Sequence, residues 1–185
     1  YSSGAHGSNT WMQWPFSAWG ADVVFSGHDH HYERIRRDGM IYFVNGAGGS
    51  ALYPTFLPVS GSEFRYNSSW GAQKVTVTPK RMLVEFYSTD QGETWVDGYT
   101  IVKAYITSSN DDAEQCPGDG SVYPTNTDLE LVDDPVRCAG QTVGLRFNGV
   151  NISSGTPLVA AMVKFREDLE VASEVTDLLL YGQAA

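Results

Sequence analysis

Cysteine is nearly absent from this 185-residue sequence, which contains only Cys116 and Cys138. There is no Cys-x-x-Cys pair and no histidine nearby, so the spacing argues against a zinc-ribbon site or a thioredoxin-like redox site. Both residues lie in turn-rich sequence. We expect a Cys116–Cys138 disulfide that closes a loop in an oxidising compartment, and two free thiols are the alternative.

Basic residues are also scarce, with 12 Lys and Arg against 22 Asp and Glu and a formal net charge of −10. Residues 1–104 are nearly balanced, with eight basic and nine acidic residues, whereas residues 105–185 have four and thirteen. This break predicts a domain boundary near Tyr105, and it argues against nucleic-acid binding by the second half. No apolar run is long enough to span a membrane.

Strong helix patterns are few, and short β-branched or aromatic runs predict a strand-rich fold. Asp38-Gly39 lies between two such runs and predicts a β-hairpin, and Pro79-Lys80 separates another pair. Residues 51–70 lack periodicity, so we expect a long loop that shapes the entrance to a site. The strands expected in the first half cover residues 21–26, which we interpret as a buried strand, and residues 32–37, 40–44, 73–78, 81–88 and 96–104.

Residues 9–20 contain Trp11, Trp14 and Trp19. Pro15 near the start and Gly20 at the end fit a short helix. Aromatic side chains at this spacing either cover a core or line a substrate cleft, and we expect them to pack in the core.

All four histidines lie within the first 31 residues, and His28, His30 and His31 directly follow the first expected strand. His28 and His30 are two residues apart, so on an extended backbone both imidazoles lean to the same side. Imidazole is a common ligand of zinc, iron, copper and nickel. The pair therefore indicates either a metal site or two surface histidines in a polar loop.

The segment Gly27-His28-Asp29-His30-His31-Tyr32-Glu33-Arg34 resembles the last metal-binding motif of the calcineurin-like metallophosphoesterases. Its Tyr-Glu-Arg ending resembles the purple acid phosphatase branch. The resemblance implies that residues 1–104 are the C-terminal part of a four-layer αββα metallophosphoesterase domain, mostly strands here. It also implies that the other metal-binding motifs precede Tyr1, so that the isolated chain is inactive.

The same resemblance implies roles for individual residues. His28 and His30 would each ligate one of two metal ions, of iron, zinc or manganese. His6 would contact the phosphate or protonate the leaving group, and an exposed loop histidine without a role is its alternative. We assign no ligand role to Asp29, because on a strand its side chain points the other way.

Arginines follow the histidines at positions 34, 36 and 37. One interpretation is a phosphate-binding patch, since guanidinium binds phosphate in a bidentate fork. The alternation of residues 32–37 instead predicts a strand with one solvated face. In the resembling family Tyr32, Glu33 and Arg34 would be structural partners behind the site, and we prefer this reading.

Residues 105–185 resemble the start of a jelly-roll-like module, and we expect a partial β-sandwich accessory domain. Its expected strands cover residues 128–132, 141–147, 159–165 and 178–182. The acidic pairs Asp111-Asp112 and Asp133-Asp134 lack the spacing of a calcium loop, so we expect a solvated acidic surface.

Two functional hypotheses follow. The first is a secreted, extracellular or periplasmic phosphoric ester hydrolase with a dinuclear metal centre, of which this chain carries the final motif. The second is a non-catalytic extracellular binding or adhesion module on a degenerate phosphoesterase fold, in which the acidic domain binds a cell surface or a polysaccharide.

Overall fold

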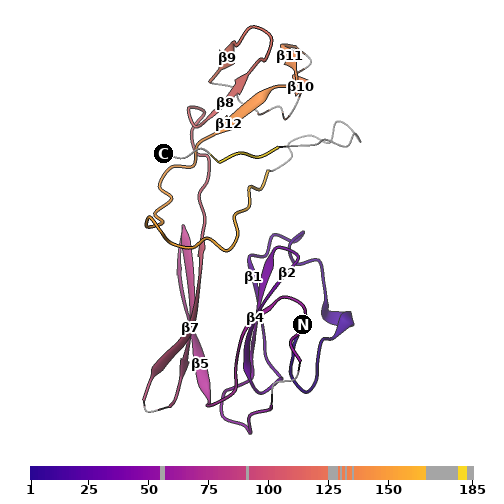
Figure 1. Cartoon of the computed structure of the whole chain (residues 1–185), viewed down its shortest axis with the longest axis vertical. Helices are drawn as coiled ribbons and strands as arrows, with labels where there is room; N and C mark the ends of the chain where they lie inside the picture. Colours follow the sequence, from indigo (N-terminus) through magenta and orange to yellow (C-terminus); the bar gives the residue numbers. More distant parts are fainter. Residues whose placement is uncertain are drawn as a thin grey trace. The chain divides into compact units, whose positions relative to one another are not determined.

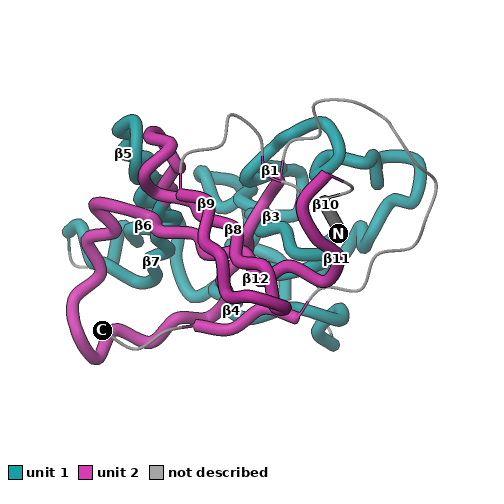
Figure 2. The backbone as a smooth tube through the Cα atoms, turned by 90° about the horizontal axis from the view of Figure 1, so that it is seen from above, with its two compact units in different colours: residues 1–102 teal, residues 103–185 magenta. Residues whose placement is uncertain are grey.

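The computed structural model describes residues 1–54, 57–90, 92–124, 129, 131, 133–134, 136–165 and 179–182. The chain divides into two compact units, Tyr1–Val102 and Lys103–Ala185, which Figure 2 colours separately. Within the described residues, strands joined by turns and loops make up the fold, with a single short 3-10 helix. The strand-rich fold that the sequence predicts is therefore confirmed (Figure 1).

The first sheet of unit 1 has the strand order β1-β3-β2-β4. Strand β1 runs parallel to β3, and β2 is antiparallel to both of its neighbours. Asp38 and Gly39 form the β2–β3 turn with φ values of 51° and 72°, the left-handed conformation that tight hairpin turns require. The strands are β1 (Val23–Ser26), β2 (Tyr32–Arg37), β3 (Met40–Asn45) and β4 (Ser62–Tyr66).

Two predictions for this sheet are wrong. Residues 51–70 are not all loop, because β4 lies within them and pairs with β2. Strand β1 is not buried throughout. It pairs only with β3 among the described strands, and Phe25 is 45% exposed. A strand at the edge of a sheet has packing partners on fewer sides, which explains this exposure.

The second sheet of unit 1 is an antiparallel meander in the order β5-β6-β7. Its first turn falls at Pro79 and Lys80, as predicted. The pairing of β6 with β7 shifts register between Phe86 and Tyr87. The strands are β5 (Gly71–Thr78), β6 (Arg81–Ser88) and β7 (Thr94–Val102).

The core of unit 1 joins the two sheets. The Tyr32 ring of β2 stacks on the Phe86 ring of β6 at a centroid distance of 4.1 Å, and both side chains are almost fully buried. Stacked aromatic pairs of this kind contribute beyond the apolar area that they bury. The buried cluster consists of Tyr32, Ile41, Phe43, Ala47, Val84 and Phe86.

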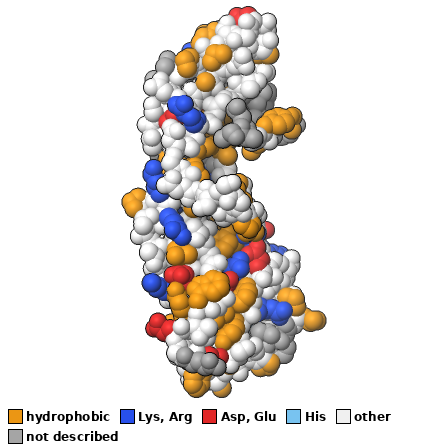
Figure 3. Space-filling model, turned by 60° about the vertical axis from the view of Figure 1, so that its left-hand side comes forward, with side chains coloured by type: hydrophobic (Ala, Val, Ile, Leu, Met, Phe, Trp, Pro, Cys, Tyr) orange, Lys and Arg blue, Asp and Glu red, His pale blue; other side chains and the backbone are white. Residues whose placement is uncertain are grey.

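The prediction for residues 9–20 is wrong. Only Thr10–Met12 form a 3-10 helix, and Pro15 lacks the N–H that would continue a helix. Trp11, Trp14 and Trp19 are 89%, 50% and 64% exposed, so they do not pack in a core. Instead, Trp14, Phe16 and Trp19 contact one another, with ring centroids about 6 Å apart. Exposed hydrophobic side chains are also visible on the face shown in Figure 3.

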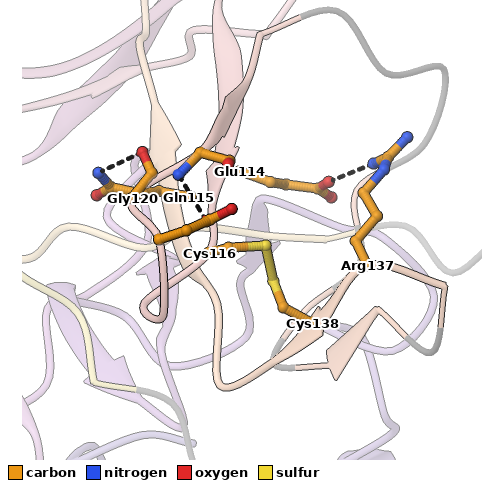
Figure 4. Close-up of a disulfide and its surroundings, with 8 residues drawn as sticks. Glu114, Gln115, Cys116, Gly120, Arg137 and Cys138 are labelled. Carbon is orange, nitrogen blue, oxygen red and sulfur yellow. Dashed lines mark hydrogen bonds and ion pairs between the residues drawn. A yellow bond between two sulfur atoms is a disulfide. The ribbon is translucent and has the colours of Figure 1, made fainter.

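Unit 2 contains a three-stranded sheet in the order β12-β8-β9 and the separate pair β10-β11. A disulfide joins Cys116, directly after β8, to Cys138 in β11. Beside it, the buried Glu114 carboxylate accepts a hydrogen bond from Arg137 at 3.2 Å (Figure 4). The strands are β8 (Asp112–Gln115), β9 (Val122–Tyr123), β10 (Asp133–Asp134), β11 (Cys138–Ala139) and β12 (Thr142–Leu145).

Several predictions for unit 2 need correction. Residues 159–165 and 179–182 form no strand, and the strand predicted over 128–132 lies mostly outside the described residues. Asp111 is not on a solvated surface. It is buried and accepts hydrogen bonds from Arg146 at 2.8 Å and Asn148 at 2.7 Å. The Arg146 hydrogen bond is the main cause that lowers the pKa of Asp111.

Candidate functional site

The predicted site lies where the chain leaves β1. Residues 28–31 form a bend rather than an extended strand, which corrects the backbone expected there. His28 has a φ of 76°, a conformation that is uncommon for residues other than glycine and is often found at functional sites. His28 is exposed, Asp29 is buried and His30 is partly buried, so successive side chains still point in different directions.

The bend brings three histidine rings into one neighbourhood. The His6 ring stacks on the His28 ring with centroids 4.0 Å apart. The His30 ring stacks on Tyr53 at 4.2 Å, and the same tyrosine lies 5.7 Å from His6. His6 thus contacts His28 directly, and His6 and His30 are both close to the Tyr53 ring.

The surroundings of His30 define its tautomer. Its Nδ1 lies 2.8 Å from the carbonyl oxygen of Ala51. A carbonyl oxygen only accepts hydrogen bonds, so Nδ1 carries the proton and Nε2 presents the lone pair in the neutral ring. Metal-binding histidines usually have this arrangement, in which one ring nitrogen donates to a carbonyl or carboxylate and the other binds the metal.

The donor set of the described residues is incomplete for a metal site. In that part of the chain, no group of three or more His, Cys, Asp or Glu side chains is placed to hold a metal ion. The described residues therefore do not form a closed metal site by themselves.

His31 lies apart from this cluster and is fully buried. Its Nε2 lies 3.2 Å from Oε2 of the buried Glu33, and its Nδ1 has no hydrogen-bond partner among the described residues. Glu33 also accepts hydrogen bonds from the main-chain N–H of Ser3 at 2.8 Å, from the Ser3 hydroxyl, and from the Ser62 hydroxyl at 2.6 Å. Glu33 thus joins the N-terminal loop to β2 and β4.

Burial alone would raise the pKa of Glu33, but the hydrogen bonds from His31, Ser3 and Ser62 lower it from 4.5 to about 2. The folded chain therefore keeps this carboxylate ionised in acid, where the unfolded chain takes up a proton. We expect the Glu33 contribution to stability to be fully present above pH 4.5 and to be lost as the pH falls towards 2.

This prediction is tested by urea unfolding of the wild type and Glu33→Gln at pH 3 and pH 6. The wild type should lose more stability between the two pH values than the variant, which has no carboxylate to titrate. Equal losses would contradict the assignment.

Arg34 and Arg36 do not form a free phosphate-binding patch. Arg34 donates to both carboxylate oxygens of Asp97, at 3.0 and 3.2 Å, and also to Glu63. Arg36 donates to Glu63 at 2.6 Å. Tyr32 donates to Asp97 at 2.8 Å, and burial followed by the Asp97 charge raises the pKa of Tyr32. These contacts hold β2 against β4 and β7, and every residue of β2 is buried or half-buried, so neither face is fully solvated.

Gly46, directly after β3, allows the backbone there to lie close to the bend at residues 28–31. A Cβ atom on Gly46 would lie 2.2 Å from the carbonyl oxygen of Asp29, so only glycine fits without displacement of the backbone. The Gly46 N–H also donates to the carbonyl oxygen of His31 at 3.1 Å.

Sequence reasoning missed Tyr53, which stacks on His30. Asn67 donates to the carbonyl oxygen of Tyr53 at 2.9 Å, and the Tyr53 N–H donates to that of His30 at 3.0 Å. No local pattern in residues 51–70 predicts these contacts, because they form only when the loop folds back over the bend.

Comparison with known proteins gives similarity of fold. No family model and no curated protein matches the chain. Among solved structures, the chain is similar to GAP50, described as the anchor in the inner membrane complex of Plasmodium. The TM-score is 0.51 at 20% identity, over 58% of this chain and 35% of that one. It is also similar to purple acid phosphatase PPD1 from yellow lupin (Lupinus luteus) seeds, with a TM-score of 0.50 at 24% identity, over 57% of this chain and 23% of that one.

The chain thus spans well under half the length of either structure. No helix of the described residues is long and apolar enough to cross a membrane. At these identities the likeness concerns the fold, and the chain is similar in fold to part of a purple acid phosphatase.

Proposed function

We propose that this chain supplies part of the metal and phosphate site of a metal-dependent phosphoric ester hydrolase, with the remaining ligands contributed by residues outside it. The observation that carries the proposal is that His6 stacks on His28 at the bend after β1, and that His6 and His30 both lie beside Tyr53. The fold similarity to a purple acid phosphatase supports it independently.

His28 and His30 are the proposed ligands. The Ala51 carbonyl holds the proton of His30 on Nδ1 and leaves Nε2 for coordination. A dinuclear centre of iron, zinc or manganese, when bound, supplies charge stabilisation to the phosphate and activates a water molecule.

His6 is the proposed substrate residue. Its ring is exposed and stacks on the ring of His28, so it can contact a phosphate ester held beside that ligand. A histidine in this position can hold a proton near neutral pH and give it to the leaving oxygen.

Unit 2 is proposed to be an accessory β-domain that binds a cell surface or a polysaccharide. The Cys116–Cys138 disulfide supports an extracellular or periplasmic location, because disulfides persist in oxidising compartments.

The second candidate is a non-catalytic binding role for the whole protein. The similarity to GAP50 favours it, because that protein is described as an anchor. In that case the histidine cluster would be a remnant without metal.

The test uses the 185-residue chain and a longer protein that contains it. Both are purified without chelator, analysed for metal content and assayed with 4-nitrophenyl phosphate. We expect metal and hydrolysis in the longer protein, and no hydrolysis by the chain alone. A longer protein without metal that hydrolyses neither monoesters nor diesters would refute the enzyme and favour the binding role.

A further inference from the structure

The buried Asp29 carboxylate has no role in the proposed metal site, although it lies between the two proposed ligands in the sequence. Asp29 is 2% exposed. A buried carboxylate is costly unless its oxygens receive hydrogen bonds, so its partners indicate why it is there. Its partners belong to the N-terminal loop, not to the metal-ligand bend.

The two oxygens of Asp29 hold two points of that loop. Oδ1 accepts a hydrogen bond from the main-chain N–H of His6 at 2.9 Å. Oδ2 accepts a hydrogen bond from the hydroxyl of Ser2, which in turn accepts one from the N–H of Gly4 at 3.0 Å. The loop therefore wraps around one carboxylate group.

Gly4 makes this wrapping sterically feasible. A Cβ atom on Gly4 would lie 2.4 Å from Cγ of Asp29 and 2.6 Å from Cε1 of His31. The loop backbone thus lies directly against the Asp29 side chain, and the next turn, closed by the Gly7 N–H on the Gly4 carbonyl oxygen at 3.1 Å, presents His6.

We propose that Asp29 is a positioning residue that holds the His6 ring against His28, and so fixes the proposed proton donor relative to the proposed metal ligands. This inference rests on the proposed function for its catalytic consequence, but the placement of His6 can be tested without activity. Asp29 lies directly between His28 and His30 in the chain, so a loop held by Asp29 would move together with the two proposed ligands and keep His6 in the same position relative to them.

The alternative is that Asp29 serves stability alone, as the nearby Glu33 network does. Ser62→Ala is the matched control, because it removes a hydrogen bond from the buried Glu33 without touching His6 or Asp29. A general loosening of the loop would affect His6 in both variants, whereas specific positioning would affect it only when Asp29 is changed.

The first measurement is nuclear magnetic resonance of the 185-residue chain without metal. Wild type and Ser62→Ala should show a nuclear Overhauser contact between the His6 and His28 rings and a protected His6 amide. Asp29→Ala should lose both. Asp29→Asn keeps a side-chain oxygen as acceptor for the His6 N–H, so it should retain both and serves where Asp29→Ala does not fold. Ser2→Ala should weaken the contact, because it frees the Asp29 carboxylate to rotate.

The second measurement uses the longer protein and two substrates. An alkyl phosphate needs a proton on its leaving oxygen, whereas 4-nitrophenyl phosphate does not. Asp29→Ala should lower kcat for the alkyl ester about 10-fold more than for the aryl ester, with metal content unchanged. When His6→Ala is already present, adding Asp29→Ala should not change the ratio of kcat for the alkyl ester to kcat for the aryl ester any further.

The outcomes separate the two proposals. A ring contact and amide protection that persist in Asp29→Ala would overturn the positioning role, whatever the activity. Equal kcat losses for the two esters in Asp29→Ala would also overturn it. A Ser62→Ala variant with the same losses as Asp29→Ala would overturn it as well. A wild-type protein that hydrolyses neither ester would refute the proposed function, and the magnetic resonance result would still decide whether Asp29 positions His6.

Discussion

The His28→Ala/His30→Ala double variant of the longer protein should lose bound metal and hydrolysis of 4-nitrophenyl phosphate together. Changes in residues that only orient a metal ligand weaken metal affinity 10- to 100-fold, so removal of two ligands should reduce both quantities by more than about 100-fold. His28 is exposed and His30 is only partly buried, so the fold should persist. Elemental analysis, the phosphatase assay and circular dichroism on the same sample check the three expectations.

His6→Ala is the control for this prediction. It removes a histidine from the same cluster that we do not assign as a ligand, so metal content should stay near that of the wild type while turnover falls. If the double variant keeps its metal, His28 and His30 are not ligands. If His6→Ala loses metal as completely as the double variant does, His6 is itself a ligand and its proposed role is wrong.

Replacement of Glu33 by alanine should lower the free energy of unfolding of unit 1 by about 3–5 kcal/mol, because several buried donors lose their acceptor at about 1–3 kcal/mol each. The change deprives the fully buried His31 of its Nε2 partner. It also leaves the N–H and hydroxyl of Ser3 and the hydroxyl of Ser62 without this acceptor. Buried donors that lose their acceptors cost more than an average hydrogen bond contributes.

Urea unfolding at pH 7, followed by tryptophan fluorescence, measures this effect. Glu85→Ala is the matched control, because Glu85 lies in β6, is partly exposed, and accepts a hydrogen bond from Tyr87 at 3.0 Å. We expect less than about 1 kcal/mol for the control. Equal effects of the two substitutions would show that the Glu33 network does not stabilise unit 1.

The hairpins of unit 1 were predictable because their signals are local. Asp38-Gly39 adopts the left-handed conformation that such a turn requires, and the alternating residues on either side pair around it. The Pro79-Lys80 turn follows the same logic. Turn chemistry and side-chain alternation act over a few residues, so they can be read without knowledge of the rest of the chain.

Long-range pairing was not predictable in the same way. Strand β4 lies within an apparent loop and exists because it pairs with β2, 27 to 34 residues earlier in the chain. Conversely, residues 159–165 alternate as a strand would, yet they form none. Strand formation depends on partners and burial, which a local pattern does not specify.

The candidate site shows the same division. The sequence alone pointed to His28 and His30 through their spacing, the strand before them and the residues that follow, and to His6 through resemblance. Nothing in the sequence indicated a role for Ser2 or Tyr53. It set Asp29 aside as a ligand, and the structure gives that side chain a different set of contacts.

By itself, the sequence determined the strand-rich composition, the local hairpins and the position of three histidines directly after the first strand. Only the tertiary structure decided that His6 stacks on His28, that Asp29 holds the loop of His6, and that Arg34 is occupied by Asp97. The physical reason is that residue chemistry is a local property. Burial and hydrogen-bond partners are decided only when segments distant in the chain pack against one another.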